Sequence, residues 1–507
     1  MITAVEPKKL HYWVGGEWRL SRTDHYMDCY DPSTGEIVAR APQCTPSEVE
    51  EAIRAAKAAF PAWADMPPNK RVQVLFRMKA LLDAHLEELT RLVAEEHGKV
   101  WDEAQGDVLK VTEVVEFAAG APHLLKGPAI MNATPGYDTT QVLEPVGVFA
   151  GIAPWNFPAM IPMGWMAPLC IATGNTMVLK AASFVPRSSM RIMELWAEAG
   201  LPKGVLNLVT CSRKEAEILL THPDVKGISF VGSTSVGQHI YSVAASHGKR
   251  VQALTEAKNH ALVLRDAALE RTARGIVNSA CGCAGERCMA LPVAVVEEAV
   301  ADDLVETLVR VMKDLRVGPA YDTSSQLGPL VNEDHRQSVV SWIGKGVEEG
   351  AELVLDGRGR TVAGYEKGFY LGPTLFDRVT RGMSVGDREI FGPVLCIKRV
   401  KDFDEGVELI NENEFGNGSV IYTQSGYHAR EFTRRSHAGM VGVNVGIPVP
   451  LAMFGFTGHK ASFFGDLHTM GTDGVRFFTE QKSVTAHWFS AAEAREGKVR
   501  NSWDGMI

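Results

Sequence analysis

The most informative stretch of this chain reads Cys281-Gly282-Cys283-Ala284-Gly285-Glu286-Arg287-Cys288-Met289-Ala290, and an apolar run continues to residue 296. The apolar run predicts a buried strand, and the small residues before it predict a close approach of the backbone to a ligand. Arg287 stands beside Cys288, and a nearby cation favours the nucleophilic thiolate. We therefore expect a reactive Cys288 at the mouth of a strand; the alternative is a buried, unreactive cysteine.

Cysteine spacing bears on both metal binding and the redox environment. Cys281, Cys283 and Cys288 lie close together, which leaves a metal site as another alternative. No histidine is near and the spacing is not the usual paired zinc pattern, so we expect no metal. The eight cysteines of the chain are irregularly spaced, and residues 1–10 lack the apolar core of a secretion signal. Both features predict reduced thiols and a cytoplasmic location.

Composition narrows the class of protein. The chain has 507 residues, 45% hydrophobic and 22% charged, which is typical of a globular protein with two or more domains. The net charge of −9 argues against nucleic acid as a partner. Residues 146–174 carry no charge and are long enough to cross a bilayer. Several prolines and Asn156 instead predict a buried strand, a loop and a buried helix, so we expect no membrane partner.

Strands and helices alternate from residue 143 onward. Strands are expected at residues 146–152, 176–180, 204–210 and 227–231, with helices over residues 186–199 and from residue 235. After residue 254 the alternation restarts, with strands at residues 261–264 and 289–296 and a helix at residues 302–315. This pattern predicts an α/β fold with parallel sheets covered by helices, and ligands at the carboxyl ends of the strands.

The two ends of the chain carry simpler signals. Thr45-Pro46-Ser47-Glu48 predicts a helix start with a capping box. Apolar residues at helical spacing predict one long helix over residues 71–97, which Gly98 ends. Residues 477–488 alternate like a strand, which we expect to complete the sheet of a neighbouring subunit.

Polar and glycine residues stand where the expected strands end. Gly232 and Ser233 lie between a strand and a helix, where they either bind a pyrophosphate or form an ordinary turn. Lys180 ends a strand and points either into a ligand site or into solvent. Asn156 follows Trp155, and its amide either donates to a developing oxyanion or packs a loop.

Taken together, these motifs resemble the aldehyde dehydrogenase superfamily over nearly the whole chain. The motifs in chain order are Pro154-Trp155-Asn156-Phe157-Pro158, Leu179-Lys180, Gly232-Ser233, Gly285-Glu286-Arg287-Cys288 and Glu389-Ile390-Phe391-Gly392-Pro393. Within the superfamily the sequence most resembles the CoA-acylating methylmalonate-semialdehyde dehydrogenases. That resemblance is carried by Cys288-Met289-Ala290-Leu291, Ala257-Lys258-Asn259-His260, residues 441–451 and residues 453–458.

The resemblance implies a fold and a division of the chain. The fold would be that of an aldehyde dehydrogenase, with a Rossmann-type cofactor domain, an α/β catalytic domain and a small β flap. The cofactor domain would take residues 1–124 and 145–254, and the catalytic thiol domain residues 255–453. Residues 125–144 and 475–495 would form oligomerisation strands, and the protein would be a homo-oligomer, either a dimer or a tetramer.

The resemblance also implies roles for single residues. Cys288 would attack the aldehyde, while the Asn156 amide and the Cys288 backbone N–H hold the oxyanion. A hydride would pass to NAD or NADP, and the acyl group left on sulfur would pass to CoA. The nucleotide would contact Trp155, Lys180, Ser183, Gly232, Ser233, Glu389 and Phe391.

Three positions depart from the family pattern. Leu254 stands where hydrolytic members carry a glutamate that activates water, which favours CoA as acyl acceptor; Glu256, two residues on, either restores a base or points into solvent. Lys110 stands where the acylating branch carries a second arginine beside Arg287 for a substrate carboxylate, and lysine lacks the bidentate fork. Ser183 replaces the glutamate of NAD-preferring members, which favours NADP.

Four functions follow from these residues. The first is an NAD(P)-dependent, CoA-acylating dehydrogenase of a short, carboxylated semialdehyde. The second is the same oxidation ending in hydrolysis, with Glu256 as base. The third is a redox-free hydrolase built on Cys288, and the fourth is a non-catalytic binding protein. The nucleotide-site residues disfavour the third, and an intact Cys288 with Asn156 disfavours the fourth.

Overall fold

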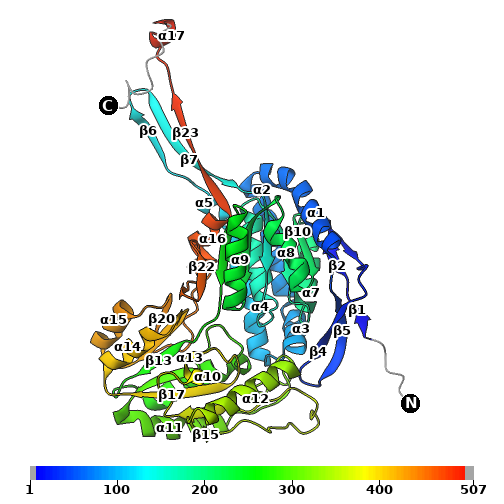
Figure 1. The fold of residues 1–507 in the computed structure, drawn as a ribbon. Helices are drawn as coiled ribbons and strands as arrows, with labels where there is room; N and C mark the ends of the chain where they lie inside the picture. Colours follow the sequence, from blue (N-terminus) through cyan, green and yellow to red (C-terminus); the bar gives the residue numbers. More distant parts are fainter. Residues whose placement is uncertain (1–6, 497–507) are drawn as a thin grey trace.

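The computed structural model describes residues 7–496 of the chain. Two large sheets lie in its two main parts, and a narrow three-stranded sheet projects from one of them (Figure 1). A further small sheet near the N-terminus joins β1 (Lys8–Lys9), β5 (Glu36–Pro42) and β4 (Tyr26–Asp31) in that order. The α/β fold expected from the alternation of strands and helices is therefore confirmed.

The larger sheet has eight strands and a parallel centre. Its order is β22 (Phe463–Gly465), β12 (Arg250–Leu254), β11 (Val225–Val231), β8 (Val148–Ile152), β9 (Thr176–Ala181), β10 (Leu206–Thr210), β2 (Tyr12–Val14) and β3 (Glu17–Arg19). The five strands from β12 to β10 run parallel, and the pairings outside them are antiparallel. Parallel strands place their carboxyl ends at one edge, which is where a ligand binds.

Helices cover both faces of this sheet. One face carries α1 (Pro46–Asp65), α8 (Arg213–Thr221) and α9 (Thr234–Ser246). The other carries α2 (Pro68–Ala84), α3 (Leu86–His97), α4 (Trp101–Ala119), α6 (Ala167–Ala172) and α7 (Arg187–Glu198). The expected start of α1 is confirmed, because Thr45 and Glu48 form a capping box.

The prediction of a single helix over residues 71–97 is wrong, because this segment forms two helices. His85, with φ −105° and ψ 15°, separates α2 from α3. The apolar residues keep helical spacing across this break, so the hydrophobic pattern alone does not reveal it. The predicted end is correct, because Gly98 follows α3 in the left-handed conformation with φ 92°.

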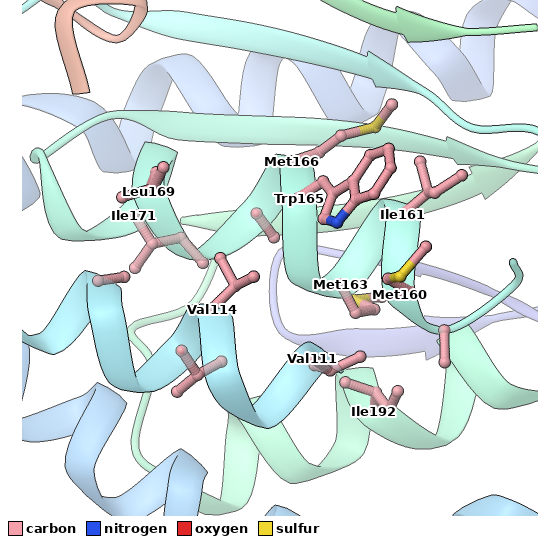
Figure 2. Packing of buried hydrophobic residues seen from close by; sticks show 14 of the residues in the cluster. Val111, Val114, Met160, Ile161, Met163, Trp165, Met166, Leu169, Ile171 and Ile192 are labelled. Carbon is pink, nitrogen blue, oxygen red and sulfur yellow. The ribbon is translucent and has the colours of Figure 1, made fainter. Parts of the chain in front are cut away.

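The uncharged stretch of residues 146–174 forms part of the core. It holds β8, the π-helix η1 (Met160–Met166) and α6, and all three are buried. Met160 and Met163 of η1 lie on the side of η1 that faces Val111 of α4 (Figure 2), and Trp165 belongs to the same buried cluster. Within residues 7–496, no helix has both the length and the apolar character that crossing a membrane requires.

The second large sheet has seven strands. Its order is β15 (Glu352–Leu355), β16 (Thr374–Asp377), β17 (Val394–Val400), β14 (Val293–Glu297), β13 (His260–Val263), β19 (Gly418–Tyr422) and β20 (Met440–Val443). All pairings are parallel except that of β15 with β16. The same core contains α10 (Leu269–Cys281), α11 (Glu298–Lys313), α12 (Glu333–Glu348), α14 (Phe403–Glu412) and α15 (Gly426–Arg435).

The projecting sheet joins β6 (Ala129–Thr134), β7 (Tyr137–Pro145) and β23 (Thr479–His487), with β7 in the middle (Figure 1). β23 pairs with β7 in antiparallel register, from Thr479 opposite Pro145 to His487 opposite Tyr137. The strand expected at residues 477–488 is therefore confirmed as β23, and it pairs with β7 of its own chain. That it also completes the sheet of a neighbouring subunit stays a prediction. The dimer or tetramer and the boundaries of the three domains stay predictions.

Candidate active site

The Cys288 loop lies between α10 and β14. The backbone after α10 is unusual, because Cys283, Ala284 and Gly285 all have positive φ, of 50°, 52° and 77°. A Cβ added to Gly285 would lie 2.1 Å from the carbonyl oxygen of Gly392. Only glycine combines this conformation with so close an approach. The motif around Cys288 and the motif around Gly392 are therefore in direct contact, although they are far apart in sequence.

Two side-chain amides bind the backbone of the Cys288 loop. The carbonyl oxygen of Cys288 accepts hydrogen bonds from Nδ2 of Asn259 at 2.8 Å and from Nδ2 of Asn417 at 3.0 Å. No role was expected for either asparagine, because their closeness to Cys288 depends on long-range packing. These bonds also explain why the strand expected from residue 289 begins only at Val293: the loop is pinned before it reaches the sheet.

Asn156, in the loop that follows β8, contacts the Cys288 loop. Its buried amide nitrogen Nδ2 donates a hydrogen bond to the carbonyl oxygen of Glu286 at 3.1 Å. A primary amide has two N–H groups, so the second remains for a further acceptor. The expected pairing of Asn156 with the Cys288 loop is therefore found in the geometry, while its contact with an oxyanion stays a prediction.

The environment of Cys288 favours its neutral thiol. Burial raises the pKa of this thiol to about 12, and the Glu389 carboxyl group adds to the rise. Arg287, expected to favour the thiolate, instead donates from Nη2 to Glu103 Oε1 at 2.8 Å, which compensates its charge. At neutral pH the Cys288 side chain is therefore a neutral thiol in this structure.

This pKa predicts the pH dependence of alkylation by iodoacetamide. Only the thiolate reacts, and below a pKa of about 12 its fraction rises about tenfold for each pH unit. We expect the rate of Cys288 alkylation in the nucleotide-free protein to rise in this way from pH 7 to pH 9.5 without a plateau. Peptide mass spectrometry at timed intervals measures it. A plateau near pH 8 would show an activated thiolate and contradict this description.

Cys288 opens onto a cavity of about 460 Å³. Arg287 and Lys110 line it together with Cys288, and the acidic residues Asp102, Glu103 and Asp107 line it as well. Apolar side chains form much of the remaining wall, namely Phe157, Met160, Trp165, Met289, Ile447, Val449 and Phe456. Lys110 donates from Nζ to Glu113 and to the carbonyl oxygen of Pro450. The cavity can therefore take a small, partly apolar molecule beside the thiol.

A second cavity, of about 360 Å³, lies at the carboxyl edge of the eight-stranded sheet. Four residues assigned to the nucleotide line it, namely Trp155, Lys180, Gly232 and Ser233. Arg213 at the start of α8 also lines it. This residue was not among the expected site residues, because nothing in the sequence around it indicates contact with a ligand. Ser183 lies just beyond β9, where it is buried and is not part of the described lining.

The turn before α9 is open at Gly232 and leads into a helix start. A Cβ on Gly232 would lie 2.5 Å from the Phe230 ring, so only glycine leaves the turn open. N–H groups at a helix start attract anions, and Thr234 N–H at present donates to Glu256 Oε2 at 2.9 Å. Glu256 thus contacts the start of α9 in this structure, and its role as a catalytic base stays a prediction.

Glu389 and Phe391 lie beside these residues. Oε1 of Glu389 accepts a hydrogen bond from Ala257 N–H at 3.1 Å, and burial raises the pKa of its carboxyl group to about 8. Phe391 has a positive φ of 62°, and its ring centre lies 5.3 Å from that of Trp155. Trp155, which follows a strand of the eight-stranded sheet, is therefore in contact with Phe391, which precedes a strand of the seven-stranded sheet. Within residues 7–496, no group of three or more histidine, cysteine, aspartate or glutamate residues is placed to hold a metal ion.

Comparison with known proteins identifies the family of the chain. Residues 18–484 match the model of the aldehyde dehydrogenase family. A malonate-semialdehyde dehydrogenase of Geobacillus kaustophilus is 48% identical over 488 residues, which cover 96% of this chain and 100% of the relative. Another, of Pseudomonas aeruginosa, is 48% identical over 480 residues, covering 94% of this chain and 96% of that one.

Solved structures give the same result. The methylmalonate-semialdehyde dehydrogenase of Oceanimonas doudoroffii has a TM-score of 0.94 and 43% identity, covering 96% of this chain and 99% of that one. A Sinorhizobium meliloti protein whose crystal structure contains NAD has a TM-score of 0.94 and 41% identity, with the same coverage of 96% and 99%. On the family match and these relatives, the chain belongs to the aldehyde dehydrogenase family.

Proposed function

We propose that the protein oxidises a short semialdehyde, an aldehyde that also carries a carboxylate, and passes the acyl group to CoA. The observation that carries this proposal is the single cavity that Cys288 shares with Arg287. Although Arg287 is paired with Glu103 in this structure, a nucleophile and a guanidinium group in one small cavity suit an aldehyde with an anionic far end. The names of the relatives, malonate- and methylmalonate-semialdehyde dehydrogenases, support the same substrate class.

The reaction begins at Cys288. Its thiol loses a proton to solvent, its sulfur bonds to the aldehyde carbon, and the carbonyl π electrons move to oxygen. The free N–H of Asn156 and the backbone N–H of Cys288 donate to this oxyanion. NAD or NADP, when bound, supplies the hydride acceptor that makes the product an acyl thioester on Cys288. Arg287 holds the far end of the substrate during these steps.

The nature of the acyl acceptor rests on two residues. Leu254 is buried at the end of β12 and has no group to activate water. Glu256, the alternative base, is engaged with Thr234 N–H at the start of α9. A thioester without a nearby base reacts better with a thiol than with water, which favours CoA. Hydrolysis with Glu256 as base is the second candidate.

Residues near the nucleotide cavity favour NADP. Lys180 and Arg213 both line that cavity, and two cations suit the additional phosphate of NADP. Ser183 adds no carboxylate that would repel it. Gly232 and Ser233 would take the pyrophosphate, and Trp155, Glu389 and Phe391 the nicotinamide end. NAD remains a substrate as well, because nothing in the described lining excludes the smaller nucleotide.

One assay tests this proposal. Malonate semialdehyde and methylmalonate semialdehyde are each supplied with NAD or NADP, with and without CoA, and products are identified by mass spectrometry. We expect acyl-CoA as product, turnover that depends on CoA, and kcat/KM for NADP at least equal to that for NAD. If free acid formed at the same rate without CoA, the enzyme would hydrolyse the thioester, and the proposal of transfer to CoA would be wrong. A preference for NAD of about a hundredfold would overturn the nucleotide proposal.

A further inference from the structure

Arg287 is already occupied by a carboxylate of its own chain. Its Nη2 donates to Glu103 Oε1 at 2.8 Å, and its Nε donates to Cys283 Sγ at 3.1 Å. The same Glu103 oxygen accepts a hydrogen bond from Cys283 N–H at 2.8 Å. Side-chain exposure is only 13% for Arg287 and 14% for Glu103, so water screens their attraction weakly.

The guanidinium group also has little freedom to move away from Glu103. It lies against Gly282, where an added Cβ would be 2.5 Å from Nη1 and 2.8 Å from Nη2. Gly282 itself has φ −59° and ψ 143°, which any residue adopts. Glycine is therefore needed at this position because Arg287 packs closely against it, and not because of the backbone conformation.

Lys110 is fully engaged elsewhere in the cavity wall. Its ammonium donates to Glu113 Oε1 at 3.0 Å, to Glu113 Oε2 at 2.9 Å and to the Pro450 carbonyl oxygen at 2.9 Å. Glu113 Oε1 also accepts from Ala452 N–H at 2.5 Å. These bonds fasten the loop at residues 450–452 to α4. They leave Arg287 as the better placed of the two cations for an anionic substrate.

We infer that Glu103 is a specificity-determining residue that lowers the affinity of the cavity for aldehydes with a carboxylate. Its own carboxylate imitates that of the substrate, because it lines the same cavity as Cys288 and binds the Arg287 group that the substrate would bind. A carboxylated aldehyde must displace or share this bond, whereas an uncharged aldehyde of the same length is unaffected. This inference rests on the proposed function and refines its substrate class.

The test compares two aldehydes of equal chain length, succinate semialdehyde and butanal. Glu103→Gln keeps an oxygen for Cys283 N–H and removes the charge that competes for Arg287. We expect the ratio of kcat/KM for succinate semialdehyde to that for butanal to rise by at least about tenfold, since a charge-assisted hydrogen bond becomes free. The change should appear in KM for the semialdehyde. An unchanged ratio, with both substrates affected equally, would overturn the inference.

Two matched variants separate specificity from folding. Glu103→Asp keeps the charge and should keep the ratio closer to that of the natural chain than Glu103→Gln does. Glu116→Gln makes the same substitution on the exposed side of α4 and should leave the ratio unchanged. A comparable rise in Glu116→Gln would assign the effect to the general charge of the helix and overturn the role of Glu103.

A second measurement does not depend on turnover. Butyrate, which cannot react, should slow the alkylation of Cys288 by iodoacetamide, and it should protect Glu103→Gln at a concentration at least about tenfold lower than the natural chain. Equal protection of both proteins would overturn the inference. Failure to form acyl-CoA in the assay above, with this difference in protection intact, would overturn the proposed function alone.

Discussion

Replacement of Cys288 by alanine is expected to lower kcat/KM for aldehyde oxidation by at least about 1,000-fold, because the sulfur forms the covalent bond on which the reaction depends. The loop around it should persist. Its hydrogen bonds from Asn259 and Asn417 are made to the backbone carbonyl of residue 288, which alanine retains. Initial rates of nucleotide reduction, followed at 340 nm, measure the effect.

Cys281→Ala is the matched control for this variant. Cys281 belongs to the same cysteine-rich stretch but is buried at the end of α10, in the core of the seven-stranded sheet. Its replacement should change kcat/KM by less than about tenfold, because its thiol faces apolar neighbours and contacts neither cavity. If Cys288→Ala kept its oxidation activity and Cys281→Ala lost it, Cys288 would not be the nucleophile.

Replacement of Asn156 by alanine is expected to lower kcat by about 100- to 1,000-fold with a much smaller change in KM. The oxyanion forms only during the reaction, so a lost donor raises the barrier more than it weakens substrate binding. The variant also loses the bond from Nδ2 to the Glu286 carbonyl oxygen, so its thermal stability must be measured beside its activity.

Asn156→Asp sharpens the same test. Aspartate has the shape of asparagine, but its ionised carboxylate donates no hydrogen bond and repels a developing negative charge. We expect a loss of kcat at least as large as that of the alanine variant. If either variant kept more than about a fifth of kcat while remaining folded, another group would have to stabilise the oxyanion.

Apolar runs in the sequence were sufficient to predict the central parallel strands, because a buried strand is recognised from its own residues. The parallel strands that carry or precede Trp155, Lys180 and Gly232 were predicted from apolar runs, and their carboxyl ends gather at the edge that holds the cavity lined by these three residues. The break at His85 could not be found in this way, since the apolar spacing continues through it.

Contacts between distant segments were the part that sequence reasoning missed. Glu103 meets Arg287 across 184 positions, and Asn417 meets Cys288 across 129. Nothing beside Glu103 or Asn417 in the sequence marks either one, because their partners are defined by the packing of α4 and of the seven-stranded sheet against the Cys288 loop. The charge compensation of Arg287 therefore emerged only from the structure.

The most direct measurement is the mass of the Cys288 peptide after rapid mixing with aldehyde and NADP, quenching in acid and digestion. CoA is omitted so that the acyl group stays on the enzyme. We predict an adduct on Cys288 whose mass is that of the aldehyde less two hydrogen atoms, formed together with an equal amount of NADPH. An adduct of the full aldehyde mass, or an acyl group on any other residue, would contradict the thioester on which this description rests.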